Sequence, residues 1–288
     1  MGPSLAARYA VYWMPTPEDP LAVIGREWLG RDAANGNAVG GPPAGLRAAV
    51  WRKLVAGPAR YGFHATLRAP MRLVQGAGEA DVLAALHRLA RTLTPVALPR
   101  LGVSWLGEAL ALRPFDGEGA VLNSAPLRDF AQAVVEAMDP LRAAPTASDL
   151  ARHDLGALTG RRRELLLRWG YPHVAEQFRF HLTLTGALGG KTAASRRYLQ
   201  ALLARHFEPV LGLRRELGAL TLFVQPHPDL DFVARASVPL GRHGVGLGAA
   251  TSPADPVARV PDDQAAQRAT RLRSPSSGSD RNAQTRAV

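Results

Sequence analysis

Hydrophobic positions recur along most of the chain at spacings that distinguish helices from strands. An apolar residue at every third or fourth position predicts amphipathic helices over residues 21–29, 79–93, 127–138 and 192–207. A shorter basic segment, residues 161–169, is also predicted to be helical, because Thr159 can cap its start and Gly170 its end.

Runs of β-branched and aromatic residues between these segments predict strands. They cover residues 8–14, 61–69, 98–106, 108–113, 178–185, 217–224 and 232–238. Their order along the chain is not a regular alternation of strand and helix. The sequence therefore predicts an α+β fold, with mostly antiparallel sheets and helices packed outside them.

Two segments lack this patterning. Residues 34–47 are rich in Gly and Pro and are predicted to form a loop. Residues 241–288 are rich in Gly, Ala, Ser, Pro and Arg, contain no aromatic residue and show no periodicity. We therefore expect a folded domain over residues 1–240 and a disordered tail over residues 241–288.

The composition removes several kinds of chemistry. The chain has no cysteine, which excludes disulfides, thiolate catalysis and cysteine-ligated metal centres. No stretch approaches the roughly eighteen consecutive apolar residues that a membrane helix needs, and the first residues do not resemble a signal peptide. The expectation is a cytoplasmic protein that has no membrane partner.

The formal net charge is +11, and an excess of basic residues favours an anionic partner. Only Lys53 and Lys191 are lysines, in a chain crowded with Ala, Gly and Pro, so the arginine bias can also reflect genome composition. No basic run alternates with aromatic residues as a nucleic-acid surface would. The charge therefore favours an anionic substrate without indicating its size.

The most informative feature is a near-repeat of an F-H-x-T-L segment. Its copies are Tyr-Gly-Phe-His-Ala-Thr-Leu at residues 61–67 and Phe-Arg-Phe-His-Leu-Thr-Leu at residues 178–184. Side chains alternate between the two faces of a strand. The apolar residues of each copy therefore share one face, which should meet the core, and the His and Thr share the other.

Two such strands side by side would bring His64, Thr66, His181 and Thr183 to one cleft, flanked by the guanidiniums of Arg68 and Arg179. A neutral imidazole can take a proton from water or a hydroxyl, and an imidazolium can protonate a departing oxygen. Thr and Arg side chains can hold the non-bridging oxygens of a phosphate. The set suits cleavage of a phosphodiester without a metal or other cofactor.

Structural roles compete with these assignments. A single histidine in a strand is more often structural than catalytic, and the histidines that have no matching motif are interpreted in this way: His87, His153, His173, His206, His227 and His243. For His64 and His181 the repetition favours function. Arg68 and Arg179 are as consistent with charges at a sheet edge as with ligand binding.

Paired H-x-T-L strands resemble the signature of the two-histidine phosphoesterase superfamily, which includes RNA ligase-like cyclic phosphodiesterases. The wider context is similar to one branch of it, proteins encoded in phosphonate-utilisation operons. The matching stretches lie between about residues 8 and 240, and they are residues 8–13, 28–32, 60–70, 169–172 and 178–186.

The resemblance implies a bilobal fold with pseudo-two-fold symmetry, in which two antiparallel sheets with outer helices surround a central cleft. It implies that the two His-Thr pairs carry the site and that Tyr61 and Tyr171 line the cleft. Arg68 stands where the branch often has lysine, which keeps the charge but changes its geometry. The implied substrate is a small phosphorylated sugar or nucleotide, with a cyclic or small phosphodiester.

Three functions stay open at this point: hydrolysis of a small cyclic phosphodiester, processing of an RNA end, and binding of an anionic ligand without turnover. A pure binder would not need two acid–base groups, which argues against the third. RNA processing ranks below the small-molecule reaction, because the sequence shows no platform of aromatic and basic residues outside the motifs.

Overall fold

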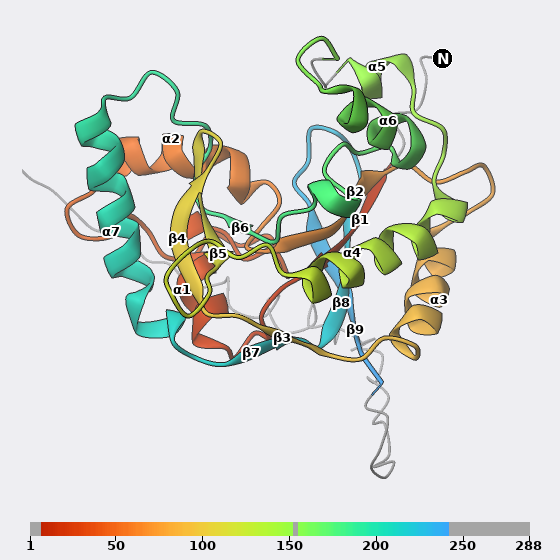
Figure 1. Cartoon of the computed structure of the whole chain (residues 1–288), viewed down its shortest axis with the longest axis horizontal. Helices are drawn as coiled ribbons and strands as arrows, with labels where there is room; N and C mark the ends of the chain where they lie inside the picture. Colours follow the sequence, from red (N-terminus) through yellow and green to blue (C-terminus); the bar gives the residue numbers. More distant parts are fainter. Residues whose placement is uncertain (1–6, 152–154, 242–288) are drawn as a thin grey trace, which may run out of the picture. The chain divides into compact units, whose positions relative to one another are not determined.

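The computed structural model describes residues 7–151 and 155–241. Within this part of the chain, seven strands form one antiparallel sheet in the order β4-β5-β6-β2-β1-β8-β9 (Figure 1). Their bounds are Arg8–Trp13 (β1), Ala65–Met71 (β2), Leu101–Leu106 (β4), Ala109–Pro114 (β5), Leu182–Thr183 (β6), Ala219–Gln225 (β8) and Val233–Pro239 (β9). A separate two-stranded ribbon pairs β3 (Val96–Leu98) with β7 (Arg215–Leu217).

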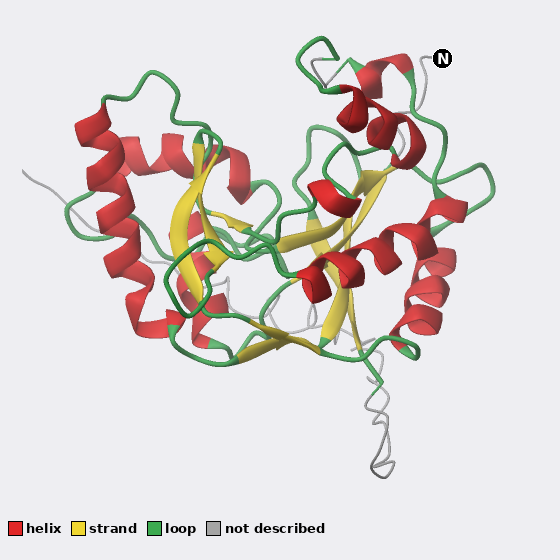
Figure 2. Ribbon diagram, viewed as in Figure 1, coloured by secondary structure: helices red, strands yellow, loops and turns green. Residues whose placement is uncertain are grey.

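Helices pack outside the strands, as Figure 2 shows in red. The longer ones are α1 (Pro20–Leu29), α2 (Ala48–Ala59), α3 (Glu79–Ala90), α4 (Ala125–Met138), α6 (Gly160–Trp169) and α7 (Ala193–Leu211). Short helical segments are α5 (Ala147–Leu150), η1 (Asp139–Leu141) and η2 (Ala175–Gln177). α3 packs on β8 and β9, α4 on β2, and α7 on β4. The predicted α+β class, with antiparallel strands and outer helices, is confirmed.

Capping residues set the ends of α1 and α6, and at α6 they are the two that the sequence predicts. The Asp19 carboxylate accepts the N–H of Leu21 at the start of α1, and Gly30 ends that helix with φ 75°. Thr159 accepts the N–H of Arg162 at the start of α6, and Gly170 ends it with φ 73°. Only glycine adopts this left-handed conformation without strain.

The sheet has two parts that meet where β2 pairs with β6. Strands β2, β1, β8 and β9 form one part, and β4, β5 and β6 form the other. The register between the two parts pairs Ala65 with Leu182. The two antiparallel sheets that the resemblance implies are therefore continuous with each other at this point. The fold thus brings the two H-x-T segments into neighbouring strands.

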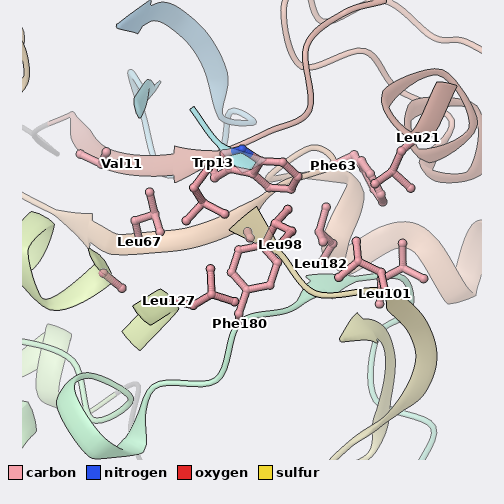
Figure 3. Close-up of a cluster of buried hydrophobic side chains, with 14 of the residues drawn as sticks. Val11, Trp13, Leu21, Phe63, Leu67, Leu98, Leu101, Leu127, Phe180 and Leu182 are labelled. Atoms are coloured by element: carbon pink, nitrogen blue, oxygen red, sulfur yellow. The ribbon is translucent and has the colours of Figure 1, made fainter. Parts of the chain in front are cut away.

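The apolar face of both H-x-T segments lies in the hydrophobic core. Phe63, Leu67, Phe180 and Leu182 point into one cluster of buried side chains (Figure 3). The Phe180 ring lies 5.7 Å from the ring of Trp13 in β1. The alternation read from the sequence is confirmed on this face, and it leaves the His and Thr side chains on the other.

Some predicted elements have different extents. The strand predicted over residues 178–185 forms a ladder only at Leu182–Thr183, because the next two N–H groups, of Leu184 and Thr185, both donate to the carbonyl of Leu110. The predicted strand over 61–69 begins at Ala65, since the residues before it form a turn.

The sequence patterns did not predict α2. This helix has no side-chain cap at its start, and it contains Pro58. It is held by packing: Leu54 and Val55 are buried, and the Trp51 indole donates a 2.7 Å hydrogen bond to the carbonyl of Trp28 in α1. Tertiary contacts therefore override a weak local signal.

The disordered tail expected for residues 241–288 lies outside the described residues, except for Gly241, and the boundary of the folded domain stays a prediction. In the described part of the chain, no helix combines the length and apolar character needed to span a membrane.

Candidate active site

The two H-x-T segments lie next to each other in the sheet. Because β2 and β6 are antiparallel and Ala65 pairs with Leu182, the next residues in the same register place His64 opposite Thr183 and Thr66 opposite His181. Directly opposite side chains of an antiparallel pair are neighbours on one face of the sheet. The four residues predicted from the repeat therefore gather on one face, at the junction of the two parts of the sheet.

A tight turn aims the first histidine. Gly62, two residues before His64, has φ 79°, and a Cβ at this position would lie 2.4 Å from the Cβ of Ala33. Glycine satisfies both the backbone conformation and this close approach. The turn leads into β2 so that the His64 imidazole lies on the sheet face that carries the His and Thr side chains of both segments.

Both imidazoles are held in the same way. His64 Nδ1 lies 2.9 Å from the carbonyl oxygen of Gly62, and His181 Nδ1 lies 2.7 Å from that of Arg179. A carbonyl oxygen only accepts, so in each ring Nδ1 carries the hydrogen and the neutral imidazole has its lone pair on Nε2. His64 Nε2 lies 3.2 Å from the hydroxyl of Thr66.

Both histidines are less basic than an exposed histidine. Burial lowers the pKa of His64 from 6.5 to about 4; its hydrogen bond to Gly62 opposes this shift, and the nearby His181 adds to it. Burial also lowers the pKa of His181, and the nearby positive charge of Arg113 lowers it further. Both rings are therefore neutral at pH 7 in the free protein, and His181 also lies close enough to Arg113 to be affected by its charge.

A cavity of about 470 Å³ opens beside these residues. His181 and Thr66 line it, together with three arginines, Arg113, Arg162 and Arg179. None of its lining residues, which all belong to the described part of the chain, is acidic. Such a lining attracts an anion, and guanidiniums bind phosphate oxygens with good geometry.

Arg113 is a site residue that the sequence reasoning missed. The register of β5 with β6 pairs Ala111 with Thr183 and Leu112 with Leu182, so Arg113 lies opposite His181. Its Nη1 donates a 2.9 Å hydrogen bond to the carbonyl of Trp105, and its buried Nε has no partner among the described residues. Strand alternation alone places Arg113 on the face opposite Leu112, but it does not reveal which strand lies alongside.

Tyr12 of β1 was also missed. It is buried, and its ring stacks on the His64 imidazole with centroids 3.8 Å apart and an interplanar angle of 22°. Burial raises the pKa of the Tyr12 hydroxyl well above its ordinary value. Tyr12 therefore fixes the plane of the His64 ring by stacking on it, and its hydroxyl stays uncharged.

The predicted arginines occupy two different places. Arg179 lines the cavity and donates from Nη1 to the carbonyls of Glu176 and Phe178, both at 2.7 Å. Arg68 is only 1% exposed and donates to the carbonyl of Trp169 at 2.8 Å. It lines a second, smaller cavity instead of the first.

The two predicted tyrosines, Tyr61 and Tyr171, both line the second cavity. Tyr171 lines both cavities. Tyr61 lines the second cavity, stacks on Phe232 at 5.1 Å and has its ring centroid 6.3 Å from that of His64. His64 and Thr183 line neither of these two cavities. His64 adjoins the larger cavity through its contact with Thr66.

Comparison with known proteins gives a family match. Residues 66–233 match the model of a family described as "Protein of unknown function (DUF1045)". The matched range covers more than half of the chain and includes Thr66, Arg113 and both residues of the second H-x-T pair, while His64 lies two residues before it.

Two curated relatives are similar over most of this chain. Both are named "Ribose 1,5-bisphosphate phosphokinase PhnN". The protein of Laribacter hongkongensis (strain HLHK9) is 39% identical over 225 residues, which are 78% of this chain and 50% of that protein. The protein of Janthinobacterium sp. (strain Marseille) is 33% identical over 242 residues, 82% of this chain and 51% of that protein. The chain thus spans about half the length of the curated relatives it matches.

Solved structures give weaker likenesses. The structure of Kluyveromyces marxianus Usb1 aligns with a TM-score of 0.33 and 13% identity, over 81% of this chain and 97% of that one. Its structure with uridine monophosphate aligns with a TM-score of 0.31, the same identity and the same coverage. Scores this low decide neither fold nor function.

Proposed function

We propose that this chain, which belongs to the DUF1045 family of proteins of unknown function, is a two-histidine phosphoesterase that hydrolyses a small or cyclic phosphodiester without a metal. The observation that carries the proposal is the pairing of the two H-x-T segments across β2 and β6. Each imidazole is fixed through Nδ1, which leaves Nε2 for proton transfer.

In the proposed reaction one imidazole acts as base and the other as acid. The base Nε2 takes a proton from the attacking water, and the other ring, protonated in the complex, donates its proton to the oxygen of the breaking P–O bond. Both rings are neutral in the free protein, so one of them must gain a proton with the substrate. A bound phosphate anion favours this, because negative charge beside an imidazole raises its pKa.

The remaining groups hold the phosphate. The hydroxyls of Thr66 and Thr183 flank the histidines and can donate to non-bridging oxygens. Arg113 and Arg179 supply positive charge beside His181, where charge on these oxygens shifts during the reaction. Tyr61 and Tyr171 bound the ligand on the side of the second cavity.

The names of the relatives support a phosphorylated ribose as substrate. Hydrolysis of a cyclic phosphodiester adds water, breaks one P–O bond and leaves a phosphomonoester. If the ribose already carries another phosphate, the product is a ribose bisphosphate. Ribose 1,5-bisphosphate appears in the name of both relatives, each about half of which matches this chain. We therefore propose cyclic phosphates of ribose or of a ribonucleotide as the substrate class.

The first test is mutation of the two histidines. His64→Ala and His181→Ala should each lower kcat/KM by about 10²–10⁴, roughly 3–5 kcal/mol of barrier, because each removes an acid–base group. Thr66→Val and Thr183→Val should cost less, about 1.5–3 kcal/mol. The measurement is phosphorus NMR of product formation from ribose 1,2-cyclic phosphate, the same compound with a 5-phosphate, and a 2′,3′-cyclic nucleotide.

The exposed His87 of α3 offers a matched control, since His87→Ala removes an imidazole that lies outside both motifs and should leave the rate unchanged. Wild-type turnover in both active-site histidine variants would refute the proposal. So would loss of activity on treatment with EDTA, which would indicate a metallohydrolase instead.

A further inference from the structure

A second cavity, of about 220 Å³, lies against the same strand as the first. Four arginines line it: Arg8, Arg68, Arg72 and Arg142. Asp149 is the single acidic residue of this lining, all of which is described. The excess of guanidiniums over carboxylates gives this lining a positive charge, which favours an anion.

The arginines of this cavity differ in how far their charge is already compensated. Arg72 forms an ion pair with Asp149. Arg142 forms one with Asp139, at 2.9 Å. Arg8 donates to the side-chain oxygen of Gln225 at 2.6 Å.

Arg68 has no carboxylate partner among the described residues. Its Nη1 donates to the carbonyl of Trp169, and its Nε is buried without a hydrogen-bond partner. The side chain is 1% exposed, so water does not compensate for the missing partner. Burying a guanidinium without a counter-ion lowers the stability of the folded protein, and an anionic ligand in the cavity would recover part of that loss.

The two cavities are neighbours. They share Ala69 and Tyr171 in their linings. Thr66 lines the first and Arg68 the second, and these residues are only two positions apart in β2. That separation suits two phosphate groups carried by one small sugar.

We infer that the second cavity binds a phosphomonoester of the same substrate whose phosphodiester lies against Thr66 and His181. The substrate is then a sugar that carries two phosphate groups, one cyclic or diester and one terminal. The terminal group takes the place of the missing counter-ion of Arg68, and Arg8 and Arg142 border it. This inference rests on the proposed function for the reaction, although the binding of the second phosphate can be measured apart from it.

The experiment compares two substrates with the full chain: ribose 1,2-cyclic phosphate and the same compound with a 5-phosphate. The wild type should prefer the second by roughly 10- to 100-fold in kcat/KM, the range expected for hydrogen bonds to a charged group. Arg68→Gln and Arg8→Gln should each reduce this preference by at least about fivefold. Arg205→Gln, which removes an exposed arginine of α7, should keep it.

A binding measurement separates this inference from the proposed function. Ribose 5-phosphate has no phosphodiester to hydrolyse, and the dependence of its binding on Arg68 or on His181, measured by calorimetry, shows which of the two cavities holds it. It should bind wild type and His181→Ala equally and bind Arg68→Gln roughly tenfold more weakly or not at all. If Arg68→Gln does not fold, Arg8→Gln carries the same comparison.

The outcomes then differ. Equal hydrolysis of both cyclic substrates by the wild type would overturn the second site and leave the phosphoesterase standing. Hydrolysis of none of the three cyclic phosphates, with binding of ribose 5-phosphate that depends on Arg68 or Arg8, would overturn the phosphoesterase and support the site. Binding of ribose 5-phosphate that is lost in His181→Ala but kept in both arginine variants would overturn the site.

Discussion

His64 and His181 owe their low basicity to their position between packed strands. Each imidazole sits on the site face directly beside side chains that are buried, and each loses hydration that would stabilise its charged form. The carbonyls that hold Nδ1 fix the tautomer but offset only part of this loss. A neutral Nε2 at pH 7 is the form that a general base requires.

The lowered pKa of His64 makes a prediction about stability. The unfolded chain binds a proton at His64 near pH 6.5, whereas the folded chain does so only near pH 4. Between these values the unfolded state holds more protons, so the free energy of unfolding should fall as the pH is lowered from 6.5 to 4, by up to about 3 kcal/mol. Above pH 6.5 this residue should add no pH dependence.

Urea denaturation at a series of pH values measures this effect. In His64→Gln the slope between pH 6.5 and pH 4 should be smaller than in the wild type, while His87→Gln should keep the wild-type slope. Identical slopes in wild type and His64→Gln would show that the imidazole is solvated in the folded protein.

At the scale of elements, the turn that precedes β2 controls where the first imidazole points. Gly62→Ala should destabilise the protein by about 2–4 kcal/mol, because it adds left-handed backbone strain and a clash with Ala33. Gly76 has φ 85° with open space around it, so Gly76→Ala should show the strain alone, about 1–2 kcal/mol.

The two glycine variants should also differ in activity, measured below the unfolding transition. Gly62→Ala should lower turnover, since its carbonyl holds His64 Nδ1 and the turn must move to admit the methyl group. Gly76→Ala should leave turnover unchanged. Equal effects of both substitutions on rate would contradict a positioning role for the turn.

In the whole molecule as far as it is described, one hydrophobic cluster includes side chains from both parts of the sheet, among them Trp13, Phe63, Phe180 and Leu112. The junction of β2 and β6 is short, so this shared core carries most of the connection between the two parts. We therefore expect them to unfold together in a single transition, although each has its own helices.

Phe180→Ala tests this shared core. It should lower the free energy of unfolding by about 3–5 kcal/mol, and circular dichroism and tryptophan fluorescence should report the same shifted midpoint. Leu213→Ala, at a side chain that is 50% exposed, should change stability by less than about 0.5 kcal/mol. Two separate transitions, with only one of them shifted by Phe180→Ala, would indicate independently folding halves.

Features that depend on neighbours along the chain could be predicted from the sequence. Helix caps such as Thr159 and Gly170 act within a few residues, and strand alternation separates the core face from the face of the His and Thr side chains within each H-x-T segment. The repeat identified the two His-Thr pairs for the same reason, because the members of each pair are only two residues apart in the chain.

Only the tertiary structure decided which strands lie side by side. That pairing brings Arg113 beside His181, stacks Tyr12 on His64 and places Arg68 in a second cavity. It also holds α2, whose local signals are weak, through packing on α1. Contacts between distant segments depend on which strands pair when the whole core packs, and no local pattern of residues determines that pairing.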